Sequence, residues 1–467
     1  MYNLGIVNGY VVSGIEIRKA NLYIQDGKVA KVTNELLEAT QIYDASDLHI
    51  IPGCLDVHCH FRDPGYTNKE DMPHGTRAAA VGGVTTVFDM PNTNPPVRDA
   101  QSFREKASYF SDRAYVDFAL WGIALGKMNS DKLAEMMEVG AIALKFFWGY
   151  ALNSKSYELI YNYKPGMPDL IAPLDNGEVY ELFEEVARTG ALLAIHAEDH
   201  VLVRTMTERV LRSERRDYAA LLEARSNLAE EVAIQTAIAF SKVTGAKLHI
   251  AHISTQEGIE LVKEAQKKGI SVTTETCSHH LFLDSDDYDR VGPVMKVYPP
   301  VRGKRDRQAL WSGLHEGTVA LVCSDHAPHA LEDKKGDLFT VPAGMCDVET
   351  MLPLMLNEVS RGVITLPFIV QKMAENPAKL FNLYPQKGSL EPGSDADIVL
   401  IDLSKEAEIR NERLHSKQPL TSYHGTLVKG CIVATFLRGR QIVKDGEVVG
   451  EPLGQLVKPF KRAESIC

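Results

Sequence analysis

The sequence predicts an α/β protein: a large (β/α)8 barrel with a small β-sandwich built from both ends of the chain. Two observations carry this prediction. In the middle of the chain, apolar runs of strand length alternate with amphipathic helical patterns or glycine-marked connections. At the two ends, short strands with turn signals follow one another without helical patterns between them, which indicates a separate β domain.

The two ends of the chain share a pattern of short apolar runs separated by turn residues. The segment ANLYIQDGKVAKVTN contains an Asp26-Gly27 turn, and KGCIVATFLRGRQIVKDGEVVG contains an Asp445-Gly446 turn. An Asp-Gly pair between apolar runs is typical of a two-residue hairpin turn. We therefore expect residues 1–52 and 385–467 to form one composite β-sandwich domain, and residues 53–384 to form the barrel.

Eight apolar runs fill the central region. Continuous apolar strands are typical of a parallel sheet that is buried on both faces. Eight units favour a closed barrel over an open doubly wound sheet, and no GxGxxG motif follows the first run, which weakens a dinucleotide-binding alternative. The runs are LDVHCH (55–60), TTVFDMP (85–91), YVDFALWGI (115–123), AIALKFF (141–147), ALLAIHAE (191–198), KLHIAHIS (247–254), ISVTTETC (270–277) and VALVCSD (319–325).

Composition and charge narrow the classes of function. The chain has 467 residues, 45% of them hydrophobic, which is enough for one large core and a smaller one. Its net charge of −11 argues against nucleic-acid and anionic-membrane partners and favours a small-molecule substrate. No apolar stretch of membrane-spanning length and no signal-peptide pattern is present, so we expect a cytoplasmic protein. The seven scattered cysteines predict neither a disulfide framework nor a thiolate zinc site.

Metal-capable side chains lie at the C-terminal ends of five of the runs. In a (β/α)8 barrel these ends share the face that carries the active site. The spacing of His58 and His60 places both side chains on the same side of a strand, and paired imidazoles suit Zn²⁺ or a similar divalent ion. We therefore predict that six residues converge on a metal site: His58, His60, Lys145, His196, His252 and Asp325.

Lys145 fits such a site only after modification. Four histidines and one aspartate supply more ligands than one ion needs but fewer than two ions need. A ligand that bridges two ions is therefore required. An ammonium group offers no lone pair and is repelled by cations. A carbamate formed from CO2 on Lys145 is an anion with two oxygens, and it can hold two ions roughly 3.5–4 Å apart.

The ordered set of motifs resembles the cyclic amidases of the amidohydrolase superfamily, which include dihydroorotases, allantoinases and hydantoinases. The resemblance covers essentially the whole chain. It implies that the HxH pair binds one metal ion, that His196 and His252 bind the other, and that the carbamate of Lys145 bridges them. The matching segments are DVHCHFRDPG with the following KED, GTRAAAVGGVTTVFDMPNTNPP, HAED, HIAHIS, CSDHAPH and GSLEPGSDADIVL.

The resemblance also implies an activity and an assembly. The expected reaction is hydrolysis of a cyclic C–N bond by a hydroxide shared between two divalent ions, for which Zn²⁺ is the expected metal. Asp325 would be both a metal ligand and the proton shuttle. Relatives of this kind form dimers or tetramers, so a homo-oligomer is expected.

Four residues bear on the choice of substrate. Arg62, Asn92 and His329 resemble the trio with which dihydroorotases bind a ring carboxylate, and a guanidinium suits that group. Ser278, in ETCSHHLFL, is the fourth predicted substrate contact. These residues favour dihydroorotase, which interconverts dihydroorotate and N-carbamoyl-aspartate.

Several alternatives stay open. The LKFF and ETCSHHLFL segments are similar to those of allantoinases and hydantoinases. A single-metal deaminase and a scaffold without metal also occur on this fold, and the number of bound ions would separate them. Arg62, Asn92 and His329 could serve as turn or bracing residues. The long segment 153–178 has the aromatic and proline content of a lid or pocket wall.

Overall fold

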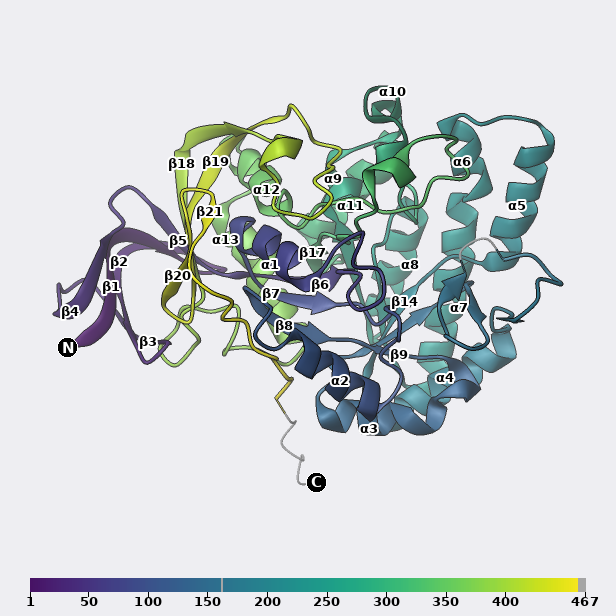
Figure 1. Cartoon of the computed structure of the whole chain (residues 1–467), viewed down its shortest axis with the longest axis horizontal. Helices are drawn as coiled ribbons and strands as arrows, with labels where there is room; N and C mark the ends of the chain where they lie inside the picture. The colour runs from purple at the N-terminus through teal and green to yellow at the C-terminus, as the bar shows by residue number, and fades with distance from the viewer. Residues whose placement is uncertain (161–162, 461–467) are drawn as a thin grey trace.

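The computed structural model describes residues 1–160 and 163–460 of the chain. Figure 1 shows an α/β molecule with a strand-rich end and a larger body in which helices surround further strands. N-terminal strands in purple and C-terminal strands in yellow lie side by side at the strand-rich end.

A nine-stranded sheet joins the two ends of the chain. Strand β5 pairs parallel with β1 and antiparallel with β18, which links the N-terminal strands to the C-terminal ones. Its strands are β1 (Tyr2–Val12), β2 (Ile17–Gln25), β3 (Lys28–Thr33), β4 (Ala39–Asp44), β5 (His49–Pro52), β18 (Ile398–Glu408), β19 (Leu427–Leu437), β20 (Arg440–Lys444) and β21 (Glu447–Val448). The domain boundaries at 52/53 and 384/385 stay predictions.

Both predicted hairpin turns are confirmed. Asp26 and Gly27 connect the antiparallel strands β2 and β3, with φ angles of 51° and 76°. Asp445 and Gly446 connect β20 and β21, with φ angles of 49° and 84°. Two successive left-handed residues match the right-handed twist of the flanking strands, which is why Asp-Gly is favoured there.

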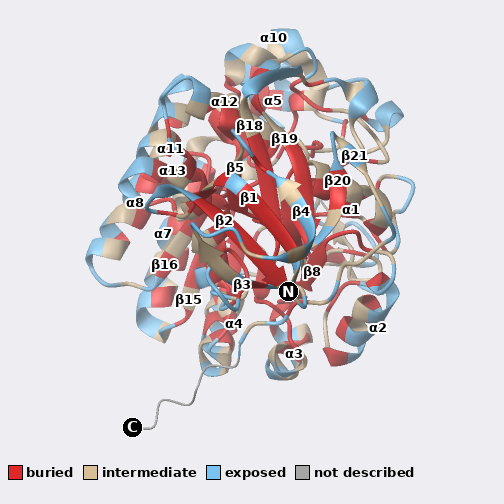
Figure 2. Ribbon diagram, turned by 90° about the vertical axis from the view of Figure 1, so that its left-hand side faces the viewer, coloured by how far each residue is buried: buried red, intermediate tan, exposed pale blue. Residues whose placement is uncertain are grey.

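The sheet has its own apolar core. Leu22 and Ile24 from β2 and Ile398 and Leu400 from β18 belong to one buried cluster. Figure 2 shows most of β1, β2 and β19 as buried, and β18 is buried in its first part, Ile398 to Ile401. The hydrogen bonds make one continuous sheet, so the predicted sandwich takes the form of a single nine-stranded sheet with a shared core.

Each of the eight predicted runs contains a strand, and the third run contains two. The strands pair in parallel and in chain order, as a buried parallel sheet requires. They are β6 (Cys54–Cys59), β7 (Val84–Asp89), β8 (Asp117–Leu120), β9 (Gly122–Ile123), β10 (Leu144–Phe147), β14 (Leu192–His196), β15 (Lys247–Ile250), β16 (Val272–Cys277) and β17 (Leu321–Cys323).

Short contacts connect the parallel strands into a continuous series. Only Trp121 separates β8 from β9, so the chain itself joins the two parallel sheets. At the other edge Cys59, the last residue of β6, forms a parallel bridge with His326, which follows β17. The amide of His60 donates to the carbonyl of His326 at 2.7 Å. The pairing therefore passes through all eight runs and returns from the last to the first.

Helices follow most of these strands and bury one face. In α4, for example, Val179, Leu182, Phe183 and Val186 repeat at helical spacing and are buried. The helices are α1 (Met72–Val81), α2 (Ala100–Phe110), α3 (Leu133–Val139), α4 (Asn176–Thr189), α5 (His200–Arg212), α6 (Tyr218–Ala224), α7 (Asn227–Thr244), α8 (Gln256–Lys267), α9 (Ser278–Phe282), α10 (Tyr288–Val291), α11 (Lys304–Glu316), α12 (Met351–Ser360), α13 (Leu366–Val370) and α14 (Asn376–Leu380). Among the described residues, no helix has the length and apolarity needed to cross a membrane.

The segment after β10 forms a small sheet of its own. Strands β11 (Ala151–Asn153), β12 (Leu159–Ile160) and β13 (Leu170–Ile171) pair antiparallel. Leu152 and Leu159 line a cavity together with Phe147 and Tyr150. The predicted lid or wall therefore lies beside the ends of the parallel strands, although residues 161 and 162 lie outside the described residues.

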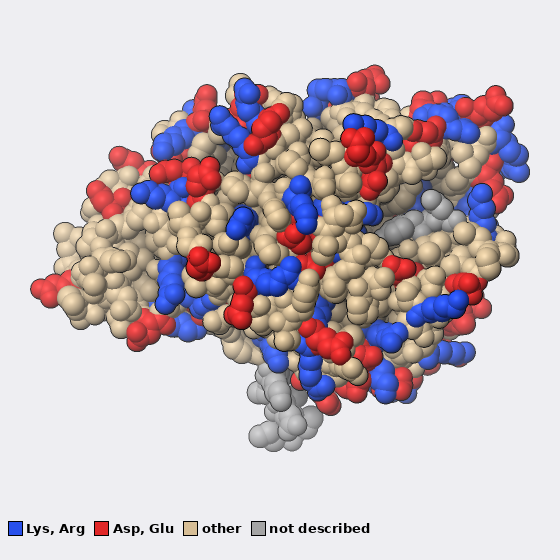
Figure 3. Space-filling view, in the orientation of Figure 1, with Lys and Arg blue, Asp and Glu red and all other residues tan. Residues whose placement is uncertain are grey.

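Charged side chains of both signs cover the face shown in Figure 3. Lys, Arg, Asp and Glu alternate there, and neither sign dominates a large area. A nucleic-acid surface would instead present a basic stripe.

Candidate metal centre

One pocket at the C-terminal ends of the parallel strands collects most of the predicted site residues. Phe147, Tyr150, Val297, Tyr298, Ala327, Ala343 and Gly344 complete its walls. The predicted residues that line it are His58, His60, Arg62, Asn92, His196, His252 and Asp325. His58 and Asp325 are 267 positions apart in the sequence, and they line the same pocket at the strand ends, as the sequence predicts.

His58 and His60 both face Asp325. The Nε2 atoms of the two rings lie 3.5 Å and 3.3 Å from Oδ1 of Asp325. Other side chains hold the opposite ring nitrogens: Nδ1 of His58 lies 2.5 Å from Oε1 of Glu275, and Nδ1 of His60 lies 2.8 Å from Oδ1 of Asn92. Because each Nδ1 meets an oxygen acceptor, it carries the proton and each Nε2 keeps its lone pair.

His196 and His252 form a second group. Nδ1 of His196, at the end of β14, lies 3.1 Å from Nε2 of His252. Nε2 of His196 lies 2.9 Å from Oε2 of Glu198, and Arg225 forms an ion pair with the same carboxylate. Glu198 therefore fixes the proton on Nε2 of His196 and leaves Nδ1 free to bind a cation.

Burial favours the neutral form of His60, His196 and His252, which is the form that binds a metal ion. Burial lowers the pKa of His60 to about 4. Burial is also the main cause of the lowered pKa of His196 and of His252, and the charge of Lys145 lowers both further. Burial alone would raise the pKa of Asp325, but His58 and His60 hold it below the usual range. An anionic carboxylate and buried imidazoles therefore lie together in this pocket.

Lys145 is fully buried near these histidines. Its Nζ has no hydrogen-bond partner among the described residues. Burial lowers the pKa of Lys145 to about 8, because the charged form loses its hydration. A substantial fraction of the amine is therefore neutral near physiological pH and able to attack CO2.

The donor set fits divalent cations. Lone pairs on Nε2 of His58 and His60 face a carboxylate oxygen, and two acceptors at such short range repel unless a cation lies between them. The unpaired Nζ of Lys145 and the unpaired Nδ1 of His252 are further buried polar atoms without protein partners. Buried polar groups normally have hydrogen-bond partners, so polar atoms without such partners indicate that a bound ion or ligand contacts them.

Three residues of the pocket have left-handed backbone. The φ angles are 60° at Arg62, 36° at His252 and 48° at Asp325. Such a conformation costs a non-glycine residue about 1–3 kcal/mol and tends to occur at functional sites. The fold therefore stabilises strained backbone where the predicted ligands and the predicted substrate arginine lie.

The predicted substrate residues have different surroundings. Arg62 donates from Nε to the carbonyl of Pro328 at 3.3 Å, and its guanidinium lies 3.3 Å from Nε2 of His329. Ser278 is fully buried, does not line the pocket, and donates its hydroxyl to Asp347 at 2.9 Å. Asn92 lines the pocket but also contacts His60, as described above.

Three residues that contact the predicted histidines were not expected from the sequence: Glu198, Glu275 and Tyr150. Glu198 is two residues after His196 in HAED, and that spacing could have indicated a carboxylate on the same side of the chain. Glu275 lies in the seventh predicted run, but its bonds to His58 and His249 depend on strands that are distant in sequence. The Tyr150 hydroxyl lies 3.3 Å from Nε2 of His196.

Comparison with known proteins identifies relatives along the whole chain. An L-hydantoinase of Paenarthrobacter aurescens is 34% identical over 465 residues, which cover 98% of each chain. An allantoinase of Deinococcus radiodurans is 35% identical and a dihydroorotase of Pyrococcus furiosus is 34% identical, each over 95% of both chains. The solved structure of an L-hydantoinase (dihydropyrimidinase) from Arthrobacter aurescens superposes with a TM-score of 0.91 at 33% identity, covering 98% of this chain and 100% of that one.

The family assignment follows from these matches. The sequence model of the Amidohydrolase family matches residues 49–442, and this range includes every residue of the pocket described above. With this match and relatives above 30% identity along nearly the full length, the chain belongs to the amidohydrolase family.

Proposed function

We propose that this protein hydrolyses a C–N bond of a cyclic amide with two divalent metal ions at the mouth of a closed (β/α)8 barrel. The observation that carries the proposal is the convergence of four histidines and one anionic aspartate in one pocket, with an unpaired buried lysine amine next to them. The full-length similarity to hydantoinases, allantoinases and dihydroorotases supports it.

The two groups of histidines divide the ligands between two ions. His58 and His60 would hold one ion, and His196 and His252 would hold the other. Lys145, as a carbamate, would bind both, and Zn²⁺ suits the nitrogen and oxygen donors. When bound, such ions polarise the ring carbonyl and bring the pKa of water toward neutrality.

Asp325 is the proton carrier in this proposal. Its pKa lies below the usual range, so the carboxylate is charged at neutral pH and can accept the proton of the attacking water. As the C–N bond breaks, Asp325 returns this proton to the ring nitrogen, which leaves poorly as an anion. One water is consumed, and the ring opens to a neutral nitrogen group and a carboxylic acid, which loses its proton to the solvent at neutral pH.

Dihydroorotate is the substrate that we propose first. Arg62 lines the pocket beside His329, and a guanidinium can pair with a ring carboxylate through two parallel hydrogen bonds. The contact between Asn92 and His60 gives Asn92 a second role, in orienting a metal ligand. Arg62 therefore carries most of the argument for a carboxylate.

An uncharged ring, such as allantoin or a substituted hydantoin, is the second candidate. Relatives named allantoinase and L-hydantoinase match this chain at 34–36% identity. Phe147 and Tyr150 add an aromatic wall to the pocket, which suits an apolar ring substituent.

Side-by-side initial rates on one zinc-loaded preparation test these candidates. The substrates are dihydroorotate, dihydrouracil, allantoin and a 5-substituted hydantoin. We expect preference for dihydroorotate, and we expect Arg62→Ala to raise its KM about 10- to 100-fold, since a charged hydrogen bond contributes about 1.5–3 kcal/mol. Dihydrouracil lacks only the carboxylate and is the matched control, so its KM should be unchanged in the variant.

Two results would contradict the proposal at different levels. Preference for an uncharged ring, with no effect of Arg62→Ala, would replace dihydroorotate by the second candidate. A content of one metal ion in the pocket would favour a deaminase, and a pocket that binds no metal would favour a non-enzymatic scaffold. Metal analysis of the same preparation separates these cases.

A further inference from the structure

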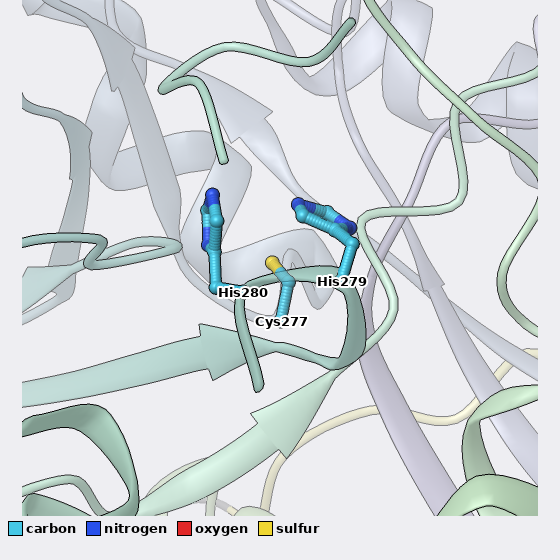
Figure 4. A group of neighbouring side chains, drawn as sticks. All are labelled: Cys277, His279 and His280. Atoms are coloured by element: carbon cyan, nitrogen blue, oxygen red, sulfur yellow. The ribbon is translucent and has the colours of Figure 1, made fainter. Parts of the chain in front are cut away.

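A second cluster of metal-capable side chains lies at the end of β16, outside the ligand set described above. Cys277 is the last residue of β16, and His279 and His280 belong to the first turn of α9. One ligand atom from each of the three lies within 4.8 Å of the others, and all three residues are buried. Figure 4 shows the sulfur of Cys277 between the two imidazole rings.

The outer ring nitrogens of both histidines have acceptors. Nδ1 of His279 lies 3.1 Å from Oδ2 of Asp347, which also accepts the hydroxyl of Ser278. Nε2 of His280 lies 3.1 Å from the backbone carbonyl of Pro299. A histidine that binds a metal usually donates its other N–H to a carboxylate or a backbone carbonyl, and these two do so.

The remaining ring nitrogens are unsatisfied. Nε2 of His279 and Nδ1 of His280 are buried and have no hydrogen-bond partner among the residues that the structure describes. Burial lowers the pKa of His280, and the carbonyl of Pro299 holds the proton on Nε2, so Nδ1 of His280 carries a lone pair. Burial alone would also lower the pKa of His279, but Cys277 and Asp347 raise it to about 10, so a cation would displace the proton on Nε2 of His279. Buried ring nitrogens without a hydrogen-bond partner are rare in proteins, and a cation is the partner that would bind both nitrogens together with the sulfur.

The donor set selects a type of metal. One thiolate and two imidazoles suit Zn²⁺, Co²⁺ or Cd²⁺, and they disfavour Mg²⁺ and Ca²⁺, which prefer oxygen ligands. The chain supplies three ligands here, so the fourth position of a tetrahedral ion would go to water. A thiolate and unprotonated ring nitrogens are the forms that bind the ion, so binding releases protons.

We propose that Cys277, His279 and His280 bind one zinc ion, separate from the two ions of the hydrolytic centre. This ion would tie the end of β16 and the start of α9 to Asp347 and Pro299, which hold the two histidines from other segments. This proposal departs from the sequence-based expectation, which included no thiolate zinc site. The proposal stands independently of the substrate.

Cobalt substitution gives a readout that the hydrolytic centre does not produce. The metal-free, full-length protein is titrated with Co²⁺, and the near-ultraviolet absorption is followed for a thiolate-to-cobalt charge-transfer band. None of the ligands that we propose for the hydrolytic centre is a cysteine, so the band reports only a cysteine site. We expect the band in the wild type, its loss in Cys277→Ser, and one fewer ion bound per chain in that variant.

Cys323→Ser is the matched control, because its sulfur lies only 3.6 Å from that of Cys277 on the neighbouring strand. This variant should keep both the band and the number of ions. His280→Asn should weaken cobalt binding at this site about 10- to 100-fold or more while the band keeps its position. His279→Asn provides the same test if His280→Asn does not fold.

Two results of the cobalt titration would overturn the proposal. Absence of the band at saturating Co²⁺ would do so, as would a band that survives Cys277→Ser and disappears in Cys323→Ser. If the wild type shows the band but binds only one ion, this proposal stands and the two-ion hydrolytic centre fails. The two proposals are therefore separable in one titration.

Discussion

Lys145 and Lys387 are both almost completely buried, but their surroundings differ. Nζ of Lys145 has no hydrogen-bond partner among the described residues, whereas Nζ of Lys387 lies 2.5, 2.9 and 2.6 Å from carboxylate oxygens of Asp117, Asp395 and Asp397. Burial lowers the pKa of Lys145 to about 8. Burial acts in the same direction on Lys387, but the three carboxylates raise its pKa above the ordinary range.

The positions of the two lysines match this chemistry. Lys145 lies in β10, beside the histidines of the pocket. Lys387 joins Asp117, at the start of β8, to Asp397, just before β18, and so connects the parallel strands to the terminal sheet. Neighbouring carboxylates, and not burial, decide whether a buried lysine is a permanent cation that holds two sheets together or an amine that can react.

Replacement of Lys145 should have the largest effect on activity. Lys145→Ala removes the proposed bridging ligand, and we expect kcat to fall about a thousandfold or more, because metal ions supply several kcal/mol of transition-state stabilisation. Acetate should restore part of the activity, since a small carboxylate can occupy the space of the carbamate. Initial rates with and without acetate are the measurement. Full activity in Lys145→Ala would contradict the carbamate assignment.

Replacement of Lys387 should act on stability. Lys387→Met leaves the buried Asp397 without an ion-pair partner and removes one of two cations from Asp117 and from Asp395, which keep Arg438 and Lys28. We expect the free energy of unfolding to fall by about 3–5 kcal/mol, measured by urea denaturation. Activity per folded molecule should be unchanged. Lys28→Met is the matched control, because Lys28 contacts Asp395 from a half-exposed position and should contribute less than about 1 kcal/mol. Equal effects of the two variants would refute the structural role of Lys387.

The pH dependence of carbamate formation should distinguish the two amines. Only a neutral amine attacks CO2, and the neutral fraction of Lys145 increases about tenfold per pH unit up to its pKa of about 8 and then levels off. Lys387, with its raised pKa, should stay protonated across this range. We expect the metal-free protein at fixed dissolved ¹³CO2 to show a buried carbamate resonance that follows this curve and is absent in Lys145→Ala. A resonance that keeps growing above pH 10 would indicate an ordinary lysine.

Much of the site was accessible from the sequence. The apolar runs located the described strands of the two central parallel sheets, because strands buried on both faces need continuous apolar residues. The i, i+2 spacing of His58 and His60 placed them on one side of β6, and both face Asp325 in the structure. Asp26-Gly27 and Asp445-Gly446 defined their turns because few residue pairs adopt two left-handed conformations in succession.

Tertiary structure decided the partners of these residues. Glu275 contacts His58 although the two are 217 positions apart in the sequence. The contacts of Lys387 with Asp117 and of Asp347 with His279 span 270 and 68 positions. No local pattern marks such pairs, because a charged residue in a strand or loop has the same sequence signature whether it meets a cation, a histidine or water. Strand positions and side-chain faces follow from local periodicity, whereas protonation and ligand geometry depend on which side chains the folded chain brings together.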